Sequence, residues 1–109
     1  MVNFPRRDEV WLVALDPSKG SEIRKTRPCL LVSPDEMNEF LQTVLVAPMT
    51  STLRNYPMRV ALTFRNKTGQ VALDQTRAVD RQRLVRKMGV VSEKTAHEVS
   101  RVLMEMFVR

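Results

Sequence analysis

Short apolar runs separated by turn-forming residues make up most of the chain. The runs span residues 10–15, 29–33, 43–47, 58–64, 70–74 and 84–91, and they are rich in Val and Leu. Runs of this length and composition are typical of buried or half-buried β-strands. The polar residues 66–69 predict a turn, and Gly89 inside the last run predicts a β-bulge.

Three segments have helical patterns. Residues 34–40 predict one or two helical turns, with Ser33 as N-cap and Pro34 in the first position. Residues 80–83 predict a single turn. From Ala96 to Phe107, apolar side chains recur at three- and four-residue steps behind Ser92, which predicts an amphipathic helix over 93–107.

This order of elements predicts a mainly β fold with a C-terminal α-helix. Many short strands and one terminal helix fit a small, strongly bent sheet or barrel on which the helix packs. The 109 residues contain no repeat or linker, so one domain over 1–109 is expected.

Charge and composition narrow the function classes. A net charge of +6 favours a polyanionic partner, with nucleic acid ahead of an anionic membrane surface. No apolar run approaches the roughly 20 residues that span a bilayer, and residues 1–8 lack the pattern of a secretory signal. Cys29 is the only cysteine, so an internal disulfide and a thiolate zinc cluster are excluded. A cytoplasmic protein without a membrane partner is expected.

The residues available for catalysis are limited. The only histidine, His97, falls on the polar face of the predicted helix, which excludes a two-histidine ribonuclease, a Ser-His-Asp hydrolase and a Cys-His hydrolase. No residues have metal-ligand spacing, so neither metal nor cofactor is expected. RNA cleavage by the substrate's own 2′-hydroxyl suits the remaining groups, since the enzyme need only align that hydroxyl and stabilise charge on phosphorus. An arginine fork matches two phosphate oxygens.

Candidate groups lie where predicted strands meet loops. Basic stretches cover 19–27 and 77–87, hydroxyl residues 50–52 close a buried strand, and Asp74 ends another. Each also has a purely structural interpretation: a solvated basic loop, a hydroxyl-capped turn, or a turn-forming aspartate. The residues alone leave both interpretations open.

Several motifs, taken in order, resemble the MazF/PemK/Kid family of toxin–antitoxin toxins. They are Val-Trp-Leu-Val at 10–13, Asp-Pro-Ser-Lys-Gly-Ser-Glu at 16–22, Lys-Thr-Arg-Pro at 25–28, Pro-Met-Thr-Ser at 48–51, and Leu-Asp-Gln-Thr-Arg-Ala-Val-Asp at 73–80. The resemblance implies a small SH3-like (CcdB/PemK-like) β-barrel that forms a homodimer. It also implies a growth-inhibiting, sequence-specific endoribonuclease (an mRNA interferase) that cuts single-stranded RNA without metal and leaves 2′,3′-cyclic phosphate and 5′-hydroxyl ends.

The resemblance carries over residue by residue. Arg27 matches the family's catalytic arginine and Thr50 its catalytic threonine, while Glu22 and Asp74 match acidic positions that serve as general base or RNA contact. Further residues would line the RNA groove: Lys19, Ser51, Gln75 and Arg77. The implied partner is a cognate antitoxin whose acidic, disordered tail covers the same groove.

Two positions depart from the family pattern. Asp8 stands where members often have glycine, and we expect it to adopt a left-handed turn. Ala72 stands where one subgroup has a catalytic arginine, which shifts weight onto Arg27 and Thr50.

Two other functions are weighed against this one. CcdB-like toxins share the barrel and bind DNA gyrase without catalysis, but residues 106–109 do not match their C-terminal pattern. An SH3-like module that binds RNA without cleaving it is the third possibility.

Overall fold

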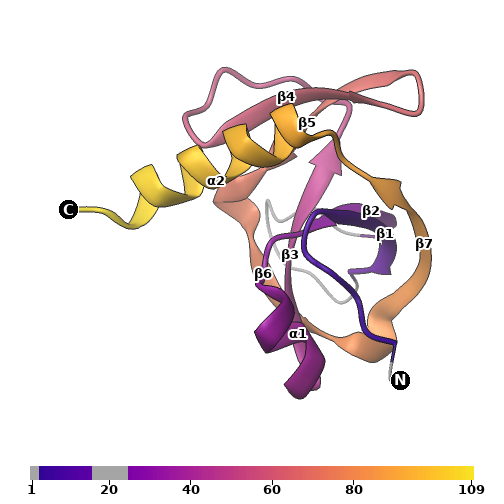
Figure 1. Ribbon diagram of the computed structural model, residues 1–109. Helices are drawn as coiled ribbons and strands as arrows, with labels where there is room; N and C mark the ends of the chain where they lie inside the picture. The colour runs from indigo at the N-terminus through magenta and orange to yellow at the C-terminus, as the bar shows by residue number, and fades with distance from the viewer. Residues whose placement is uncertain (1–2, 16–24) are drawn as a thin grey trace.

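The computed structural model describes residues 3–15 and 25–109 as a curled sheet with helices at its margins (Figure 1). The strands are β1 (Glu9–Ala14), β2 (Thr26–Leu31), β3 (Thr43–Thr50), β4 (Arg59–Phe64), β5 (Lys67–Ala72), β6 (Arg77–Asp80) and β7 (Leu84–Val90). The helices are α1 (Asp35–Phe40) and α2 (Glu93–Phe107), with 3-10 turns η1 (Leu73–Gln75) and η2 (Arg81–Arg83). No helix in the described part of the chain is long and apolar enough to cross a membrane.

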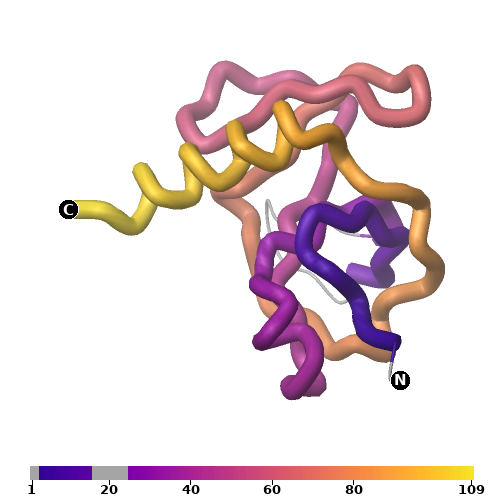
Figure 2. Tube along the Cα trace, viewed as in Figure 1, coloured from indigo at the N-terminus to yellow at the C-terminus, as the bar shows by residue number. Residues whose placement is uncertain are grey.

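The strands run antiparallel in the order β4-β5-β3-β2-β1-β7. β6 lies off this path and pairs with residues 43–46 of β3, whereas β5 pairs with Met49 and Thr50 at the end of β3. The β4–β5 hairpin and α1 lie at opposite ends of the molecule, and α2 passes beneath the hairpin (Figure 2). The hairpin tip reaches back to β7, where Arg65 donates a hydrogen bond to the carbonyl of Met88. This contact brings the two ends of the strand order together.

β2 and β3 separate at a pair of prolines. Their ladder joins Leu31 to Val46, Leu30 to Ala47 and Cys29 to Pro48, and it ends there. The next residue of β2 on that side is Pro28. Because proline has no N–H to donate, the prolines on the two strands limit pairing at this point.

Past the prolines each strand follows a different neighbour. β3 pairs Thr50 with Gln70 of β5, while β2 pairs Arg27 with Val13 of β1. If the β2–β3 register continued, Arg27 would face Thr50. The two residues therefore lie on either side of a fork in the sheet.

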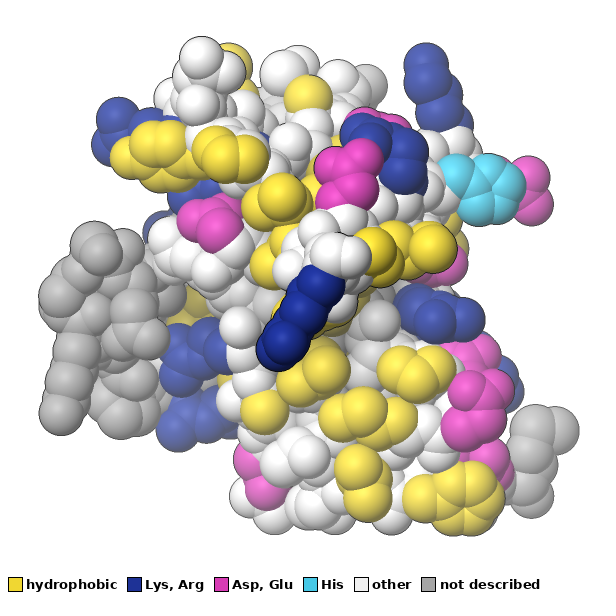
Figure 3. Space-filling view, turned by 90° about the vertical axis from the view of Figure 1, so that its left-hand side faces the viewer, with side chains coloured by type: hydrophobic (Ala, Val, Ile, Leu, Met, Phe, Trp, Pro, Cys, Tyr) yellow, Lys and Arg dark blue, Asp and Glu magenta, His cyan; other side chains and the backbone are white. Residues whose placement is uncertain are grey.

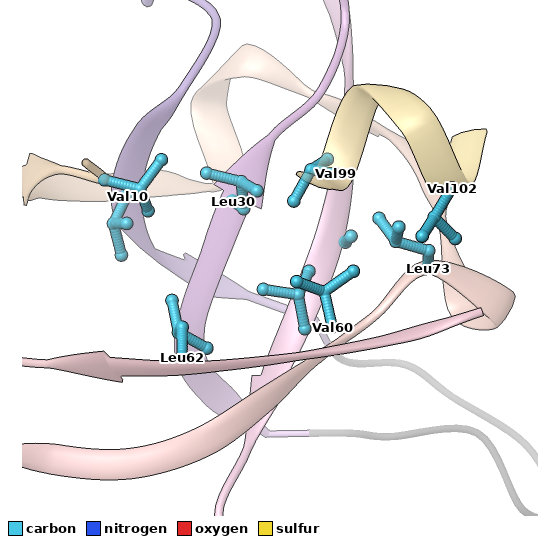
Figure 4. Packing of buried hydrophobic residues seen from close by; sticks show 10 residues of the cluster. Val10, Leu30, Val60, Leu62, Leu73, Val99 and Val102 are labelled. Carbon is cyan, nitrogen blue, oxygen red and sulfur yellow. The ribbon is translucent and has the colours of Figure 1, made fainter. Parts of the chain in front are cut away.

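The core has two clusters of buried side chains. The larger joins the inner face of the sheet to α2, and Figure 4 shows Val99 and Val102 of the helix over Leu30, Val60 and Leu73. The smaller cluster fills the space around Val13, Cys29, Leu31, Val44 and Val46. The apolar stripe of α2 thus covers the sheet, as its periodicity predicts.

The chain enters β1 through a tight turn. Asp8 has φ 75°, which confirms the expected left-handed conformation. The buried Glu9 accepts hydrogen bonds from the backbone N–H of Arg6 and from Nε1 of Trp11, and it pairs with Lys87 Nζ at 2.9 Å. Burial raises the pKa of the Glu9 carboxyl, but these donors outweigh burial and hold the pKa below its ordinary value of 4.5.

Several predictions of local structure are confirmed. Helix α2 spans 93–107, and the Ser92 side chain accepts from the Thr95 N–H. The register between β1 and β7 shifts next to Gly89, which is the predicted bulge. The turn predicted over 80–83 is η2, with the Asp80 carboxylate accepting from the Gln82 N–H.

Other predictions of local structure are wrong. Pro34, not Ser33, is the N-cap of α1. The Ser33 hydroxyl instead donates a hydrogen bond to Oδ1 of the buried Asn38. The strand predicted over 43–47 continues through Pro48 to Thr50, because β5 and not β2 supplies its last partner.

The region around the β4–β5 hairpin also differs from the prediction. The turn lies at Arg65 and Asn66, which both have positive φ, and β5 already begins at Lys67. The strand predicted over 70–74 stops at Ala72 and gives way to η1, while β6 was not predicted at all.

Candidate active site

A cavity of about 480 Å³ occupies the fork between β2 and β3. Arg27 lines it from the start of β2, and Thr50 and Ser51 line it from the end of β3. The structure thus brings to one cavity the arginine and threonine that the family resemblance implies are catalytic. Arg27 and Thr50 both belong to paired strands, which hold their side chains in place more firmly than a loop would.

Close backbone packing fixes the position of Thr50. A Cβ added at Gly69, on the neighbouring strand, would lie only 2.6 Å from the Thr50 carbonyl oxygen. The Thr50 hydroxyl accepts a hydrogen bond from the Thr52 N–H at 3.1 Å. Since a hydroxyl can donate and accept at once, this oxygen can still donate its own proton to a phosphate oxygen.

The segment that follows Thr50 is held by Gln70. This side chain accepts from the backbone N–H of Arg54 and donates to the carbonyl of the same residue, at 3.0 Å in each case. Gln70 also lines the cavity. The cavity wall and the otherwise exposed residues 51–57 are therefore tied together.

Asp74 is bound in an ion pair outside the cavity lining. Its two carboxylate oxygens accept from Nε and Nη2 of Arg59 at 2.6 and 3.1 Å. The Arg59 side chain is 5% exposed, and its guanidinium also lies 4.9 Å from the centroid of the Tyr56 ring. This hydrogen bonding raises the pKa of the Arg59 guanidinium. The arrangement clamps the start of β4 to η1.

Arg77 lies on the edge of β3 opposite to β2. It begins β6, opposite Val46, and it is partly buried. Burial raises the pKa of the Cys29 thiol to about 12, and the charges of Arg27 and Arg77 offset part of that rise. The arginine predicted to be catalytic and an arginine predicted to bind RNA therefore act on the same buried side chain.

The remaining predicted site residues fall elsewhere. Lys19 and Glu22 lie outside the described residues. Gln75 is partly buried in η1, next to Asp74. His97 is exposed on α2, as its place on the polar face predicts. Among the described residues, no three His, Cys, Asp or Glu side chains are grouped to hold a metal ion.

Sequence reasoning missed the far wall of the cavity. The β4–β5 hairpin contributes Phe64, Arg65 and Lys67, and β7 contributes Met88. The one signal in the sequence was a pair of basic residues flanking Asn66 between two apolar runs.

Comparison with known proteins identifies the family. The model of the PemK-like, MazF-like toxins of type II toxin–antitoxin systems matches residues 6–107. The chain belongs to this family. Endoribonuclease MazF9 of Mycobacterium tuberculosis (strain ATCC 25618 / H37Rv), a relative, is 36% identical over 97 residues, which cover 80% of this chain and 82% of the relative.

Solved structures of this toxin family share the fold. MazF (Form-I) from Deinococcus radiodurans is 25% identical, with a TM-score of 0.83 over 96% of this chain and 97% of the other. The MazE–MazF complex (Form-II) from the same organism contains a chain that is also 25% identical, with a TM-score of 0.74 over 96% of both chains. The expected mainly β fold with a C-terminal helix is confirmed.

Proposed function

We propose that this MazF-like toxin is a sequence-specific, metal-independent endoribonuclease that cuts single-stranded RNA, with mRNA as its substrate. The observation that carries the proposal is the shared cavity of Arg27 and Thr50. The relative named an endoribonuclease and the family of toxins to which the chain belongs support the same activity.

The reaction needs few groups from the protein. The 2′-oxygen of the ribose attacks the adjacent phosphorus, the bond to the 5′-oxygen of the next nucleotide breaks, and a 2′,3′-cyclic phosphate remains. The departing 5′-oxygen takes up a proton and leaves as a hydroxyl. The guanidinium of Arg27 stabilises the charge that builds on the phosphate oxygens, and the Thr50 hydroxyl donates a hydrogen bond to one of them.

A carboxylate is the candidate to accept the proton of the 2′-hydroxyl. Asp74 has both oxygens engaged by Arg59 and stands outside the cavity lining. This geometry weighs against Asp74 as the general base and gives it a positioning role, which leaves Glu22 as the other candidate. Lys19, Ser51, Gln75 and Arg77 remain proposed RNA contacts.

An antitoxin with an acidic tail is the proposed protein partner. The chain has a net charge of +6, and the related Deinococcus radiodurans protein was crystallised as a MazE–MazF complex. A basic groove attracts an acidic tail and RNA phosphates alike, so the tail would compete with the substrate.

A homodimer in the cytoplasm is the proposed working state. Phe40, Leu41, Met104, Phe107 and Val108 are exposed. Figure 3 shows hydrophobic side chains gathered on the face seen from the C-terminal end. Exposed apolar patches of this kind mark protein–protein contacts.

The test is incubation of the protein with a defined single-stranded transcript in EDTA. Discrete fragments with cyclic phosphate ends support the proposal, whereas intact RNA of retarded mobility indicates a binding module. Arg27→Ala and Thr50→Ala should each lower the rate about 10²- to 10³-fold, as expected for loss of one preorganised donor. Arg101→Ala, which removes an exposed arginine of α2, is the control and should cleave normally. Full activity of folded Arg27→Ala would reject the assignment.

A further inference from the structure

The cavity beside Arg27 and Thr50 has an apolar floor. Met49, Leu62, Phe64 and Met88 line it from three different strands. All four side chains also belong to the larger core cluster or pack against it. The fork in the sheet therefore leaves one edge of the core uncovered.

Basic side chains stand at two sides of this floor. Arg27 lies on the β2 side, and Arg65 and Lys67 lie on the tip of the β4–β5 hairpin. The described residues that line the cavity include no Asp or Glu. A ligand that fits this charge pattern has an apolar body with negative groups on either side of it.

Phe64 is held from two directions. A Cβ added at Gly89 would lie 3.0 Å from Cζ of the Phe64 ring, so the bulge in β7 leaves room for that ring. The Arg65 guanidinium lies 6.0 Å from the ring centroid and is tied to the Met88 carbonyl. The aromatic ring and the adjacent cation are thus fixed before any ligand arrives.

We propose that this cavity binds one unstacked nucleobase of the RNA next to the scissile phosphate, against Phe64, Leu62 and Met88. Arg65 and Lys67 contact the phosphate on the far side of that nucleotide, while Arg27 contacts the scissile one. The inference rests on the proposed function, because it names a base-binding subsite of the same reaction.

The size and chemistry of the cavity suit a base. A volume of about 480 Å³ falls within the range of small-molecule sites. Unpaired bases bind proteins by stacking on aromatic side chains and by hydrogen bonds at their edges. The hydroxyls of Thr50, Ser51 and Thr68 line the cavity and can donate to or accept from a base edge.

The experiment pairs a protein variant with altered substrates. A short single-stranded RNA with one cleavage site is compared with a set in which each nucleotide near that site is made abasic in turn. For the wild type, kcat/KM should fall about 5- to 150-fold at one position, as expected for loss of one stacked base. Phe64→Ala should show a similar fall on the intact RNA and no further fall at that same position.

Non-additivity at a single position is the signature of direct contact, since a merely structural loss would multiply with every abasic change. Phe64→Leu keeps an apolar side chain at the core edge and gives the same readout if the alanine variant does not fold. Val90→Ala, which truncates an exposed valine at the end of β7, is the control and should cleave all substrates like the wild type.

Two results overturn the proposal in distinguishable ways. If the wild type cuts RNA but Phe64 changes combine additively with every abasic position, the base subsite is refuted and the ribonuclease function stands. If the wild type cuts none of the RNAs, the proposed function and the subsite fail together.

Discussion

Replacement of Asp74 by Asn removes the charge that faces Arg59 and leaves the shape of the side chain nearly unchanged. The Arg59 guanidinium would then stay in a site where its side chain is 5% exposed, with no carboxylate to balance it. Arg59→Met removes the buried charge instead and leaves Asp74, whose side chain is 34% exposed, to be hydrated. The two single variants therefore test which half of the pair depends on the other.

The expected loss can be worked from burial. Removal of one partner from a fully buried ion pair costs about 3–5 kcal/mol. Because water reaches a third of the Asp74 side chain, the cost is discounted to about 2 kcal/mol for Asp74→Asn. In a domain of about 100 residues this lowers Tm by roughly 8 °C. The double variant, Arg59→Met with Asp74→Asn, should be more stable than Asp74→Asn alone, since it no longer buries an unpaired charge.

Thermal unfolding followed by circular dichroism measures these differences, and RNA cleavage well below Tm is measured on the same samples. Asp74→Asn should keep most of its cleavage activity, because Asp74 lies outside the cavity lining. Removal of a general base would instead lower the rate at least about 10²-fold. Additive effects on Tm in the double variant would refute the clamp. A folded Asp74→Asn variant with a rate lowered 10²-fold or more would restore Asp74 as the base.

Three further outcomes are expected. Glu9→Gln should be less stable than the wild type at neutral pH. Because folding lowers the pKa of Glu9, the stability that its charge contributes is lost as pH falls below about 4.5, and the Tm difference between the two proteins should shrink there. A constant Tm difference from pH 7 to 3 would contradict this. Cys29, with its pKa raised to about 12 by burial, should resist iodoacetamide at pH 8 until urea unfolds the chain; labelling of the native protein as fast as a free thiol would disprove its burial. Gly69→Ala forces a Cβ to within 2.6 Å of the Thr50 carbonyl oxygen, so it should lower stability by about 1–3 kcal/mol and slow RNA cleavage; unchanged Tm and rate would show that β3 can move aside freely.

Elements with a local signal were predictable from the sequence. The α2 helix has its cap and its apolar stripe within sixteen residues, so its bounds follow from Ser92 and the spacing up to Phe107. Asp8 could be placed in a left-handed turn because its position in the motif was known. Arg27 and Thr50 could be paired only because the resemblance joined two distant segments.

The errors come from interactions between distant residues. β6 is a short, partly polar strand that is stabilised by pairing with β3, which no local pattern reveals. Gly69 suggested a turn, but the structure needs glycine there for close approach to Thr50. Phe64 and Met88 meet only when the hairpin reaches β7, so their shared cavity could not be predicted from either run alone.

The prolines at 28 and 48 have a consequence for how such a protein can change. Two residues that withhold amide hydrogens open a crevice inside an otherwise continuous ladder, so no inserted loop is needed to build one. Arg27 and Thr50, the candidate catalytic residues, then lie on paired strands, while the exposed residues 51–57 follow them at the border of the cavity. Under the proposed function, variation in that stretch would alter which RNA sequence is chosen and spare the groups that cut the RNA.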